Sequence, residues 1–176
     1  MIMQDILLVI DMQKDFVDGV LGTKEAVAIV GAVREKILSH SGKVYFTRDT
    51  HHEDYLHTRE GSRLPVPHCI HGTDGWQIIP ELADLPREAV IDKPTFGSTE
   101  LTDILVRENS RNPLHSITLI GLCTDICVIS NAMLLKNALP ETDIIVDASC
   151  CAGITPESHR TALDAMKACQ IDIIGE

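Results

Sequence analysis

The sequence is poor in basic residues. It has 15 lysines and arginines against 26 aspartates and glutamates, which gives a formal net charge of −11 at pH 7. Nucleic-acid phosphates and anionic membrane surfaces repel such a chain at long range. The charge balance therefore argues against both as partners, and it favours a small-molecule substrate.

Long apolar runs are also missing, and we expect no export signal. The first apolar run, residues 6–10, has no cationic lead and stops at Asp11, which is typical of a strand and not of a signal peptide. No run approaches the roughly 20 apolar residues of a membrane-spanning helix. Without an export signal, the six cysteines are expected to be thiols. We therefore expect a cytoplasmic protein without disulfides.

Short apolar runs alternate with segments of helical period along the whole chain. The expected strands are residues 6–10, 43–47, 89–91, 116–120, 143–146 and 171–174, and the expected helices are residues 23–39, 98–108, 125–138 and 156–168. This rhythm predicts an α/β fold with a doubly wound, mostly parallel sheet of about six strands and helices on both faces. A length of 176 residues fits one domain spanning residues 1–176.

Reactive side chains follow the ends of several expected strands. Asp11 follows the first strand, Asp49 the second, Lys93 the third, and residues 121–127 the fourth. In doubly wound sheets, ligands bind beyond the carboxyl ends of the strands. We therefore expect these residues to meet at one edge of the sheet. The long irregular segment 49–76 begins at the same edge, and loops of that length are usually functional.

Cys127 lies in the segment Gly-Leu-Cys-Thr-Asp-Ile-Cys-Val, between the fourth strand and a helix. A thiol at a helix N-terminus faces unpaired N–H groups and the positive end of the helix dipole, which lower its pKa and can hold an oxyanion. Two alternatives stay open: a buried packing cysteine, or a zinc site formed with Cys123. The other cysteines are interpreted as packing residues: Cys69, Cys150, Cys151 and Cys169.

Asp11 and Lys93 can serve such a thiol. A carboxylate beside it can accept its proton and later deliver that proton to a leaving amine. An ammonium group stabilises both the thiolate and the carboxylate. The alternatives are a helix or turn cap for Asp11 and a solvated surface position for Lys93.

The irregular segment contains a candidate metal site. Asp49, His51, Glu60 and His68 offer two carboxylates and two imidazoles, a set that suits zinc, iron or manganese. Asp49 and His51 are two residues apart at a strand end, so their side chains point to the same side. The alternative is a polar loop with surface histidines, since further histidines lie nearby: His52, His57 and His71.

In this order, the residues resemble the isochorismatase-like cysteine hydrolases and, within them, the nicotinamidase branch. The resemblance spans nearly the whole chain. It rests on Asp11 with Phe16 five residues later, Lys93, Gly-x-x-Thr-Asp-x-Cys-Val at 121–128, the metal-loop spacing and Pro-His-Cys-x-x-Gly-Thr at 67–73. Isochorismatases proper lack the metal set. The resemblance implies a Rossmann-like three-layer fold and a homo-oligomer.

The family's chemistry implies hydrolysis of nicotinamide to nicotinate and ammonia, in pyridine nucleotide salvage, through a thioester on Cys127. Asp11 would take the thiol proton, and Lys93 would favour the charged forms. The backbone N–H groups of Cys123 and Cys127 would hold the oxyanion, with a cis peptide between Leu122 and Cys123.

The resemblance also implies the ligands of the ring. A divalent metal, zinc with iron or manganese as other candidates, would bind the pyridine nitrogen. Phe16, Pro65 and Leu122 are implied at the substrate pocket. Nicotinamidases usually carry an aromatic residue where this chain has Pro65, and aromatic residues make up only 3% of the sequence, so Phe96 and Trp76 are the candidate replacements.

Two other functions stay open at this point. One is a relative acting on another substrate, such as the vinyl ether of isochorismate, an N-carbamoyl compound or another small amide. The other is a non-catalytic metal- or thiol-binding domain that docks on a partner through its acidic surface.

Overall fold

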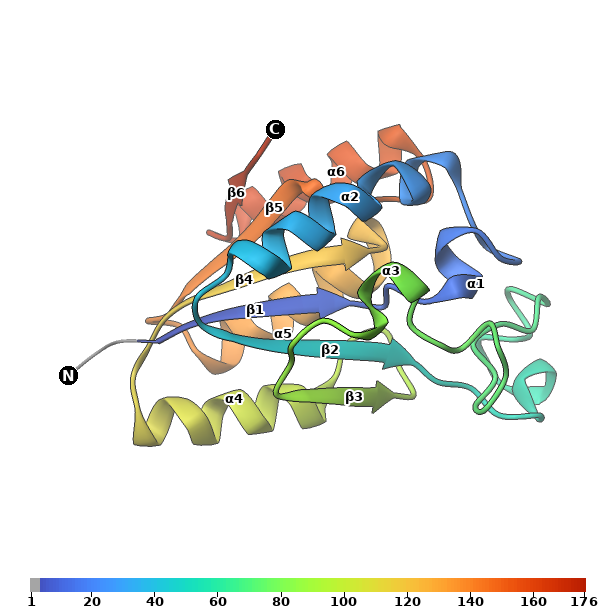
Figure 1. Ribbon diagram of the computed structural model, residues 1–176, viewed down its shortest axis with the longest axis horizontal. Coiled ribbons are helices and arrows are strands. Elements are labelled where there is room, and N and C mark those ends of the chain that lie inside the picture. Colours follow the sequence, from blue (N-terminus) through green and yellow to red (C-terminus); the bar gives the residue numbers. More distant parts are fainter. Residues whose placement is uncertain (1–3) are drawn as a thin grey trace.

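The computed structural model describes residues 4–176 and contains one sheet with the strand order β3-β2-β1-β4-β5-β6 (Figure 1). The strands are β1 (Gln4–Ile10), β2 (Lys43–Asp49), β3 (Ala89–Lys93), β4 (Leu114–Leu122), β5 (Asp143–Ala152) and β6 (Asp172–Ile174). Every neighbouring pair in this order is parallel. The predicted doubly wound α/β fold is therefore confirmed.

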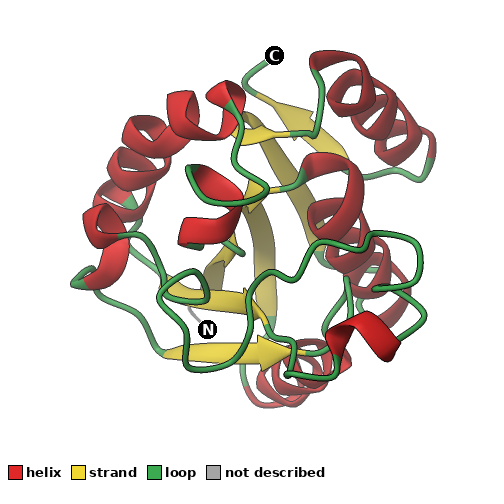
Figure 2. Cartoon of the chain, turned by 90° about the vertical axis from the view of Figure 1, so that its right-hand side faces the viewer, coloured by secondary structure: helices red, strands yellow, loops and turns green. Residues whose placement is uncertain are grey.

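Helices cover both faces of the sheet, so that the molecule has three layers (Figures 1 and 2). The helical segments are α1 (Lys14–Val17), α2 (Lys24–Ser39), η1 (Tyr55–His57), α3 (Pro80–Ala83), α4 (Thr99–Arg111), η2 (Thr124–Val128), α5 (Ile129–Ala138) and α6 (Pro156–Ala168). One buried core joins the sheet to α2 and α3. A second core joins the opposite face to α4, α5 and α6.

The central strand β1 shows why its sequence is apolar without alternation. Leu7 and Val9 contribute to the core beneath α2, whereas Ile6, Leu8 and Ile10 contribute to the core beneath α4 to α6. All five side chains have no solvent exposure. A strand covered on both faces buries every side chain, and the hydrophobic run follows from that.

The strands that lead to the reactive residues are longer than the predicted ones. β2 extends to Asp49, β3 to Lys93 and β4 to Leu122. Asp49 and Lys93 are therefore the last residues of adjacent strands, and the register of β2 and β3 pairs them directly. The predicted helix 125–138 is divided into a π-helical turn, η2, and the regular helix α5. π-helical turns are rare and are frequent at functional sites.

The order in which successive strands are added to the sheet reverses between β1 and β4. β2 and β3 lie on one side of β1, and β4, β5 and β6 lie on the other. A crevice forms at such a switch point, outside the carboxyl ends of the strands. Figure 2 looks onto this end of the sheet, where the loops and short helices gather. Within residues 4–176, no helix is both long and apolar enough to span a membrane.

Candidate active site

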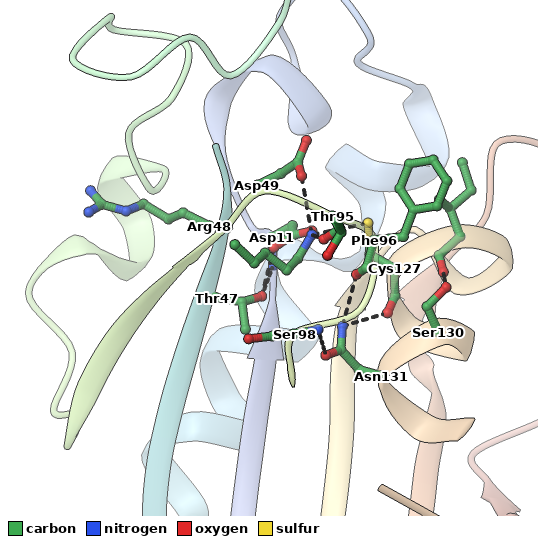
Figure 3. Close-up of polar contacts among 12 residues, drawn as sticks. Asp11, Thr47, Arg48, Asp49, Thr95, Phe96, Ser98, Cys127, Ser130 and Asn131 are labelled. Atoms are coloured by element: carbon green, nitrogen blue, oxygen red, sulfur yellow. Dashed lines mark hydrogen bonds and ion pairs between the residues drawn. The ribbon is translucent and has the colours of Figure 1, made fainter. Parts of the chain in front are cut away.

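Asp11, Lys93 and Cys127 meet at the switch point, although Asp11 follows β1, Lys93 ends β3 and Cys127 lies in η2 after β4. The Lys93 ammonium lies 2.7 Å from Asp11 Oδ2, 3.4 Å from Cys127 Sγ and 3.3 Å from Asp49 Oδ1. Figure 3 shows Asp11, Asp49 and Cys127 converging on this point. All four side chains are buried. A buried lysine among two carboxylates and a thiol is not the solvated surface residue of the alternative interpretation.

The electrostatics of this cluster fix where its protons lie. Burial opposes the charged form of Lys93, but Asp11, Cys127 and Asp49 outweigh it and raise the pKa of the ammonium. Burial raises the pKa of Asp11 despite the opposing effect of Lys93. Burial, followed by the Asp11 charge, also raises the pKa of Cys127 well above its ordinary value. The lowering expected from a helix N-terminus is therefore outweighed, and Cys127 rests as a thiol that needs a base.

Asp11 is held in place by a residue that the sequence did not single out. Thr47 Oγ1 donates a hydrogen bond to Asp11 Oδ1 (2.6 Å) and accepts one from the Asp11 backbone N–H (3.2 Å). Asp11 has φ of 47°, a left-handed conformation that aspartate tolerates better than most residues. Its two carboxylate oxygens therefore have distinct roles: Oδ1 faces Thr47, and Oδ2 faces Lys93.

The turn that carries Cys127 is fixed by Asn131, which is buried in the first turn of α5. Asn131 Nδ2 donates to the Cys127 carbonyl oxygen (2.8 Å), and its Oδ1 accepts from the Ser98 backbone N–H (2.9 Å). This side chain ties the Cys127 turn to the start of α4. A single buried amide in a segment rich in Ala, Met and Leu is the signal that could have identified it.

The peptide bond between Leu122 and Cys123 is cis, as the resemblance implies. The Cys123 carbonyl oxygen accepts hydrogen bonds from the N–H groups on either side of Cys127, those of Ile126 (3.1 Å) and Val128 (3.0 Å). Leu122, Cys123 and Cys127 all line the adjacent pocket. This turn therefore borders the space in which a ligand can bind.

Asp49, His51, Glu60 and His68 form one cluster, with one ligand atom from each residue within 4.8 Å of the others. His51 Nε2 lies 2.9 Å from Asp49 Oδ2 and 3.5 Å from Glu60 Oε1. His68 Nε2 lies 3.6 Å and 3.8 Å from the same two oxygens. Despite these short distances, His51 Nε2 is buried without a well-aligned hydrogen bond. Four donor atoms that face a common point in this way fit a divalent cation.

The protonation pattern of the cluster supports the same assignment. His68 Nδ1 lies 2.8 Å from the Val66 carbonyl oxygen, which can only accept, so Nδ1 carries a hydrogen and Nε2 faces the cluster. Burial opposes a charge on His51, yet the adjacent carboxylates of Asp49 and Glu60 raise the pKa of His51 to about 9. The two carboxylates therefore require a positive charge between them. Among the described residues, this group contains no cysteine, so the zinc site based on Cys123 finds no support.

Gln13 holds Asp49 in position and was missed in the sequence. Its Nε2 donates to the carbonyl oxygens of Asp49 and Trp76 (2.9 Å each), and its Oε1 accepts from the Asp49 N–H (2.7 Å). Gln13 is fully buried. A polar residue two positions after Asp11 was the sequence feature that could have identified Gln13. Its hydrogen-bond partners, however, are distant in the sequence.

Replacing Gln13 with leucine is expected to weaken metal binding about 10- to 100-fold, the usual cost of losing a residue that orients a ligand. The unmatched backbone groups of Asp49 shift the carboxylate that faces both the histidines and Lys93. Metal affinity can be measured by competition with a chromogenic chelator. Gln77→Leu, which changes an exposed glutamine, is the matched control, and equal affinities in the two variants would contradict the assignment.

A pocket of about 650 Å³ opens beside Cys127 and the metal cluster. Its lining includes the expected Phe16 and Leu122. Pro65 is not part of the lining, which corrects the placement implied by the resemblance. The chain forms a helical turn ending at Leu64, whose N–H donates to the Glu60 carbonyl oxygen (2.8 Å). Leu64 therefore faces the pocket, and Pro65 is exposed outside it.

Only one of the two candidate aromatic replacements reaches this pocket. Phe96 lines it and is 44% exposed. Trp76 is buried outside the pocket, where its ring lies under Arg48 (3.6 Å to the centroid) and its Nε1 donates to Thr50 Oγ1 (2.9 Å). Among the cysteines interpreted as packing residues, Cys69, Cys150 and Cys151 are buried, but Cys169 is exposed, because it follows the last turn of α6.

Comparisons with known proteins agree with this geometry. The family model of the isochorismatase domain matches residues 5–175. The chain is 26% identical to the nicotinamidase/pyrazinamidase of Mycobacterium tuberculosis, over 96% of this chain and 97% of that protein. It is 32% identical to an uncharacterised isochorismatase family protein, PncA, of Bacillus subtilis, over 92% and 93%.

Solved structures give a similar result. The pyrazinamidase of Pyrococcus horikoshii in complex with zinc superimposes with a TM-score of 0.81 at 29% identity, over 98% of this chain and 99% of that one. The pyrazinamidase/nicotinamidase of Streptococcus mutans superimposes with a TM-score of 0.82 at 30% identity, over 97% and 99%.

Proposed function

The chain belongs to the isochorismatase family, and we propose that within it the chain is a nicotinamidase, which hydrolyses nicotinamide to nicotinate and ammonia. The observation that carries the proposal is the contact of Lys93 with Asp11 and Cys127. Cys127 lines a pocket that is also lined by three members of the candidate metal group, Asp49, Glu60 and His68. The nicotinamidase and pyrazinamidase relatives support the choice of a pyridine-like amide.

In the first half of the reaction, Cys127 Sγ attacks the carboxamide carbon while Asp11 takes the thiol proton. The base is needed because burial raises the pKa of Cys127. The backbone N–H groups of Cys123 and Cys127 hold the tetrahedral oxyanion. Asp11 then returns the proton to the leaving nitrogen, ammonia departs, and an acyl thioester remains on Cys127.

In the second half, Asp11 removes a proton from water, and the hydroxide attacks the thioester carbon. The carbon–sulfur bond breaks, and nicotinate leaves as Cys127 regains a proton from Asp11. Lys93 stays protonated throughout, because the carboxylates that face it raise its pKa. Its charge stabilises whichever of Asp11 and Cys127 is negative at each step.

Asp49, His51, Glu60 and His68 would hold a divalent cation, for which zinc is our first choice and iron or manganese the others. When bound, such an ion supplies a Lewis acid that can orient a ring nitrogen. The zinc in the Pyrococcus horikoshii relative supports this choice. Phe16 and Leu122 line the same pocket and would pack against the ring.

The proposal predicts that purified, zinc-loaded protein releases ammonia from nicotinamide, and that removing the metal lowers kcat/KM at least about 10-fold. His68→Ala should lose the metal, as measured by elemental analysis, whereas His57→Ala, at an exposed position outside the cluster, should keep it. Zinc, iron and manganese can be added back in turn to rank them. Release of ammonia from an N-carbamoyl compound but not from nicotinamide would overturn the substrate and leave the cysteine chemistry intact.

A further inference from the structure

Two arginines line the pocket beside the metal cluster and have no carboxylate partner. Arg59 and Arg63 both contribute to the pocket wall, and both are exposed. Within residues 4–176, neither forms an ion pair, although the chain has 26 acidic residues. Other arginines among residues 4–176 also lack an ion pair, so what distinguishes Arg59 and Arg63 is their position at the wall of the pocket that Cys127 lines.

The backbone places the two arginines on the same side of one helical turn. Ser62 N–H donates to the Thr58 carbonyl oxygen (3.0 Å), and Leu64 N–H donates to that of Glu60 (2.8 Å). Residues four apart in such a turn are neighbours, so Arg59 and Arg63 form a like-charge pair whose repulsion destabilises the turn. An anion bound by both guanidinium groups would offset that repulsion.

The charge of the pocket also favours an anion. Asp11, Asp49 and Glu60 are acidic, but the Lys93 ammonium faces the first two, and Asp49 and Glu60 also belong to the four-residue group that fits a divalent cation. The acidic residues near the reaction centre are therefore already balanced. The two arginines remain as an excess of positive charge at the wall.

We propose that Arg59 and Arg63 bind a carboxylate of the substrate, and that the enzyme also hydrolyses primary amides that carry a carboxylate at the end remote from the amide. A pocket of about 650 Å³ is in the range that accommodates ligands larger than a single pyridine ring. Guanidinium groups bind carboxylates through paired, charge-assisted hydrogen bonds. This inference rests on the proposed function for the cysteine chemistry and extends its substrate class.

The reaction would follow the same steps as for nicotinamide. Cys127 attacks the amide carbon, ammonia leaves, and water releases a dicarboxylate from the thioester. Leu64, Phe96 and Ile154 line the pocket as apolar groups, so they can contact the methylene chain between the amide and the carboxylate.

The test compares adipamate with hexanamide, which has a similar chain without the carboxylate, in the metal-loaded enzyme. Adipamate should have the higher kcat/KM. The variant Arg59→Gln/Arg63→Gln should lower kcat/KM for adipamate about 10- to 100-fold, mainly through KM, which is the effect expected for losing charge-assisted hydrogen bonds. Hexanamide and nicotinamide should change less than about twofold, since neither carries a carboxylate. Arg34→Gln, at an exposed arginine paired with Glu35, is the control.

A binding measurement separates this inference from the proposed function. Metal-loaded Cys127→Ala protein should bind adipate more tightly than hexanoate, and the double arginine substitution should abolish the difference. Equal affinities for adipate and hexanoate, or equal losses for adipamate and hexanamide in the variant, would overturn the anion site. If adipate binds as expected but no amide is hydrolysed by the unmutated enzyme, the proposed function fails and the anion site stands.

Discussion

Replacing Cys127 with alanine is expected to lower kcat/KM for nicotinamide by about 10⁴-fold or more. The substitution removes the only atom that forms the thioester, and neither Asp11 nor Lys93 can replace it. Water held in the pocket can still be activated by Asp11, which sets the residual rate. Ammonia release under single-turnover conditions measures the residual rate, and mass spectrometry of the acylated enzyme measures the loss of the thioester.

A cysteine in the same core provides the control for this substitution. Cys151 is as buried as Cys127 and belongs to the same core cluster, but it does not line the pocket. Cys151→Ala should lower stability by a similar small amount and keep kcat/KM within about threefold, since it removes no group that touches the substrate. If the two variants lose activity equally, the loss comes from packing, and Cys127 is not the nucleophile.

Replacing Lys93 with methionine is expected to lower the free energy of unfolding by about 3–5 kcal/mol. Methionine fills most of the lysine volume but leaves Asp11 and Asp49 buried without the ammonium that faces both of them. Turnover should fall about 10²–10⁴-fold as well, because the thiolate and the carboxylate lose their stabilising charge. Urea unfolding with the metal bound gives the first quantity, and initial rates give the second.

The pH dependence of this variant follows from the Asp11 carboxyl. Burial raises the pKa of Asp11 above that of the unfolded chain, and without Lys93 only the hydrogen bond from Thr47 opposes that rise. The folded variant then binds a proton that the unfolded chain releases, so its stability falls as pH rises from about 4 towards the raised pKa. Destabilisation should therefore be larger at pH 8 than at pH 5.

A second substitution distinguishes electrostatics from packing. In Asp11→Asn/Lys93→Met, the uncompensated carboxylate is gone, so much of the lost stability should return while activity remains absent. Lys14→Met, which removes the exposed pair with Asp74 (2.6 Å), should cost no more than about 1 kcal/mol. A Lys93→Met protein as stable as the Lys14→Met protein would contradict the role of Lys93 as the counter-charge.

The positions of Asp11, Lys93 and Cys127 at one sheet edge followed from the sequence, because parallel strands place their carboxyl ends together. The direct pairing of Asp49 with Lys93 depends on the register between β2 and β3. That register is set by side-chain packing between residues distant in the sequence, so no local pattern reports it. The strand ends were predicted too short for the same reason: Asp49 and Lys93 are polar, and only their buried partners make them tolerable in a strand.

The supporting residues were harder to recognise than the reactive ones. Gln13, Thr47 and Asn131 act through hydrogen bonds to groups 33 to 63 positions away or to the backbone of a turn, and none has a motif of its own. The resemblance implies that Pro65 lines the pocket, and this placement is wrong. One helical turn between Glu60 and Leu64 decides that Leu64, and not Pro65, faces the pocket. A resemblance supplies a position in the chain but not the local backbone that orients it.

Asp49 faces two neighbourhoods at once: its Oδ1 lies 3.3 Å from the Lys93 ammonium, and its Oδ2 lies 2.9 Å from His51 Nε2. Charge drawn towards one oxygen is withdrawn from the other. The occupancy of the loop site and the ionisation of the Cys127 thiol are therefore linked equilibria, and linkage is reciprocal. If a bound cation changes the proton affinity of the Cys127 thiolate by some factor, protonation of that thiolate changes the cation affinity of the loop site by the same factor. The acid dissociation constant of the thiol and the cation dissociation constant of the loop therefore each depend on both groups of residues.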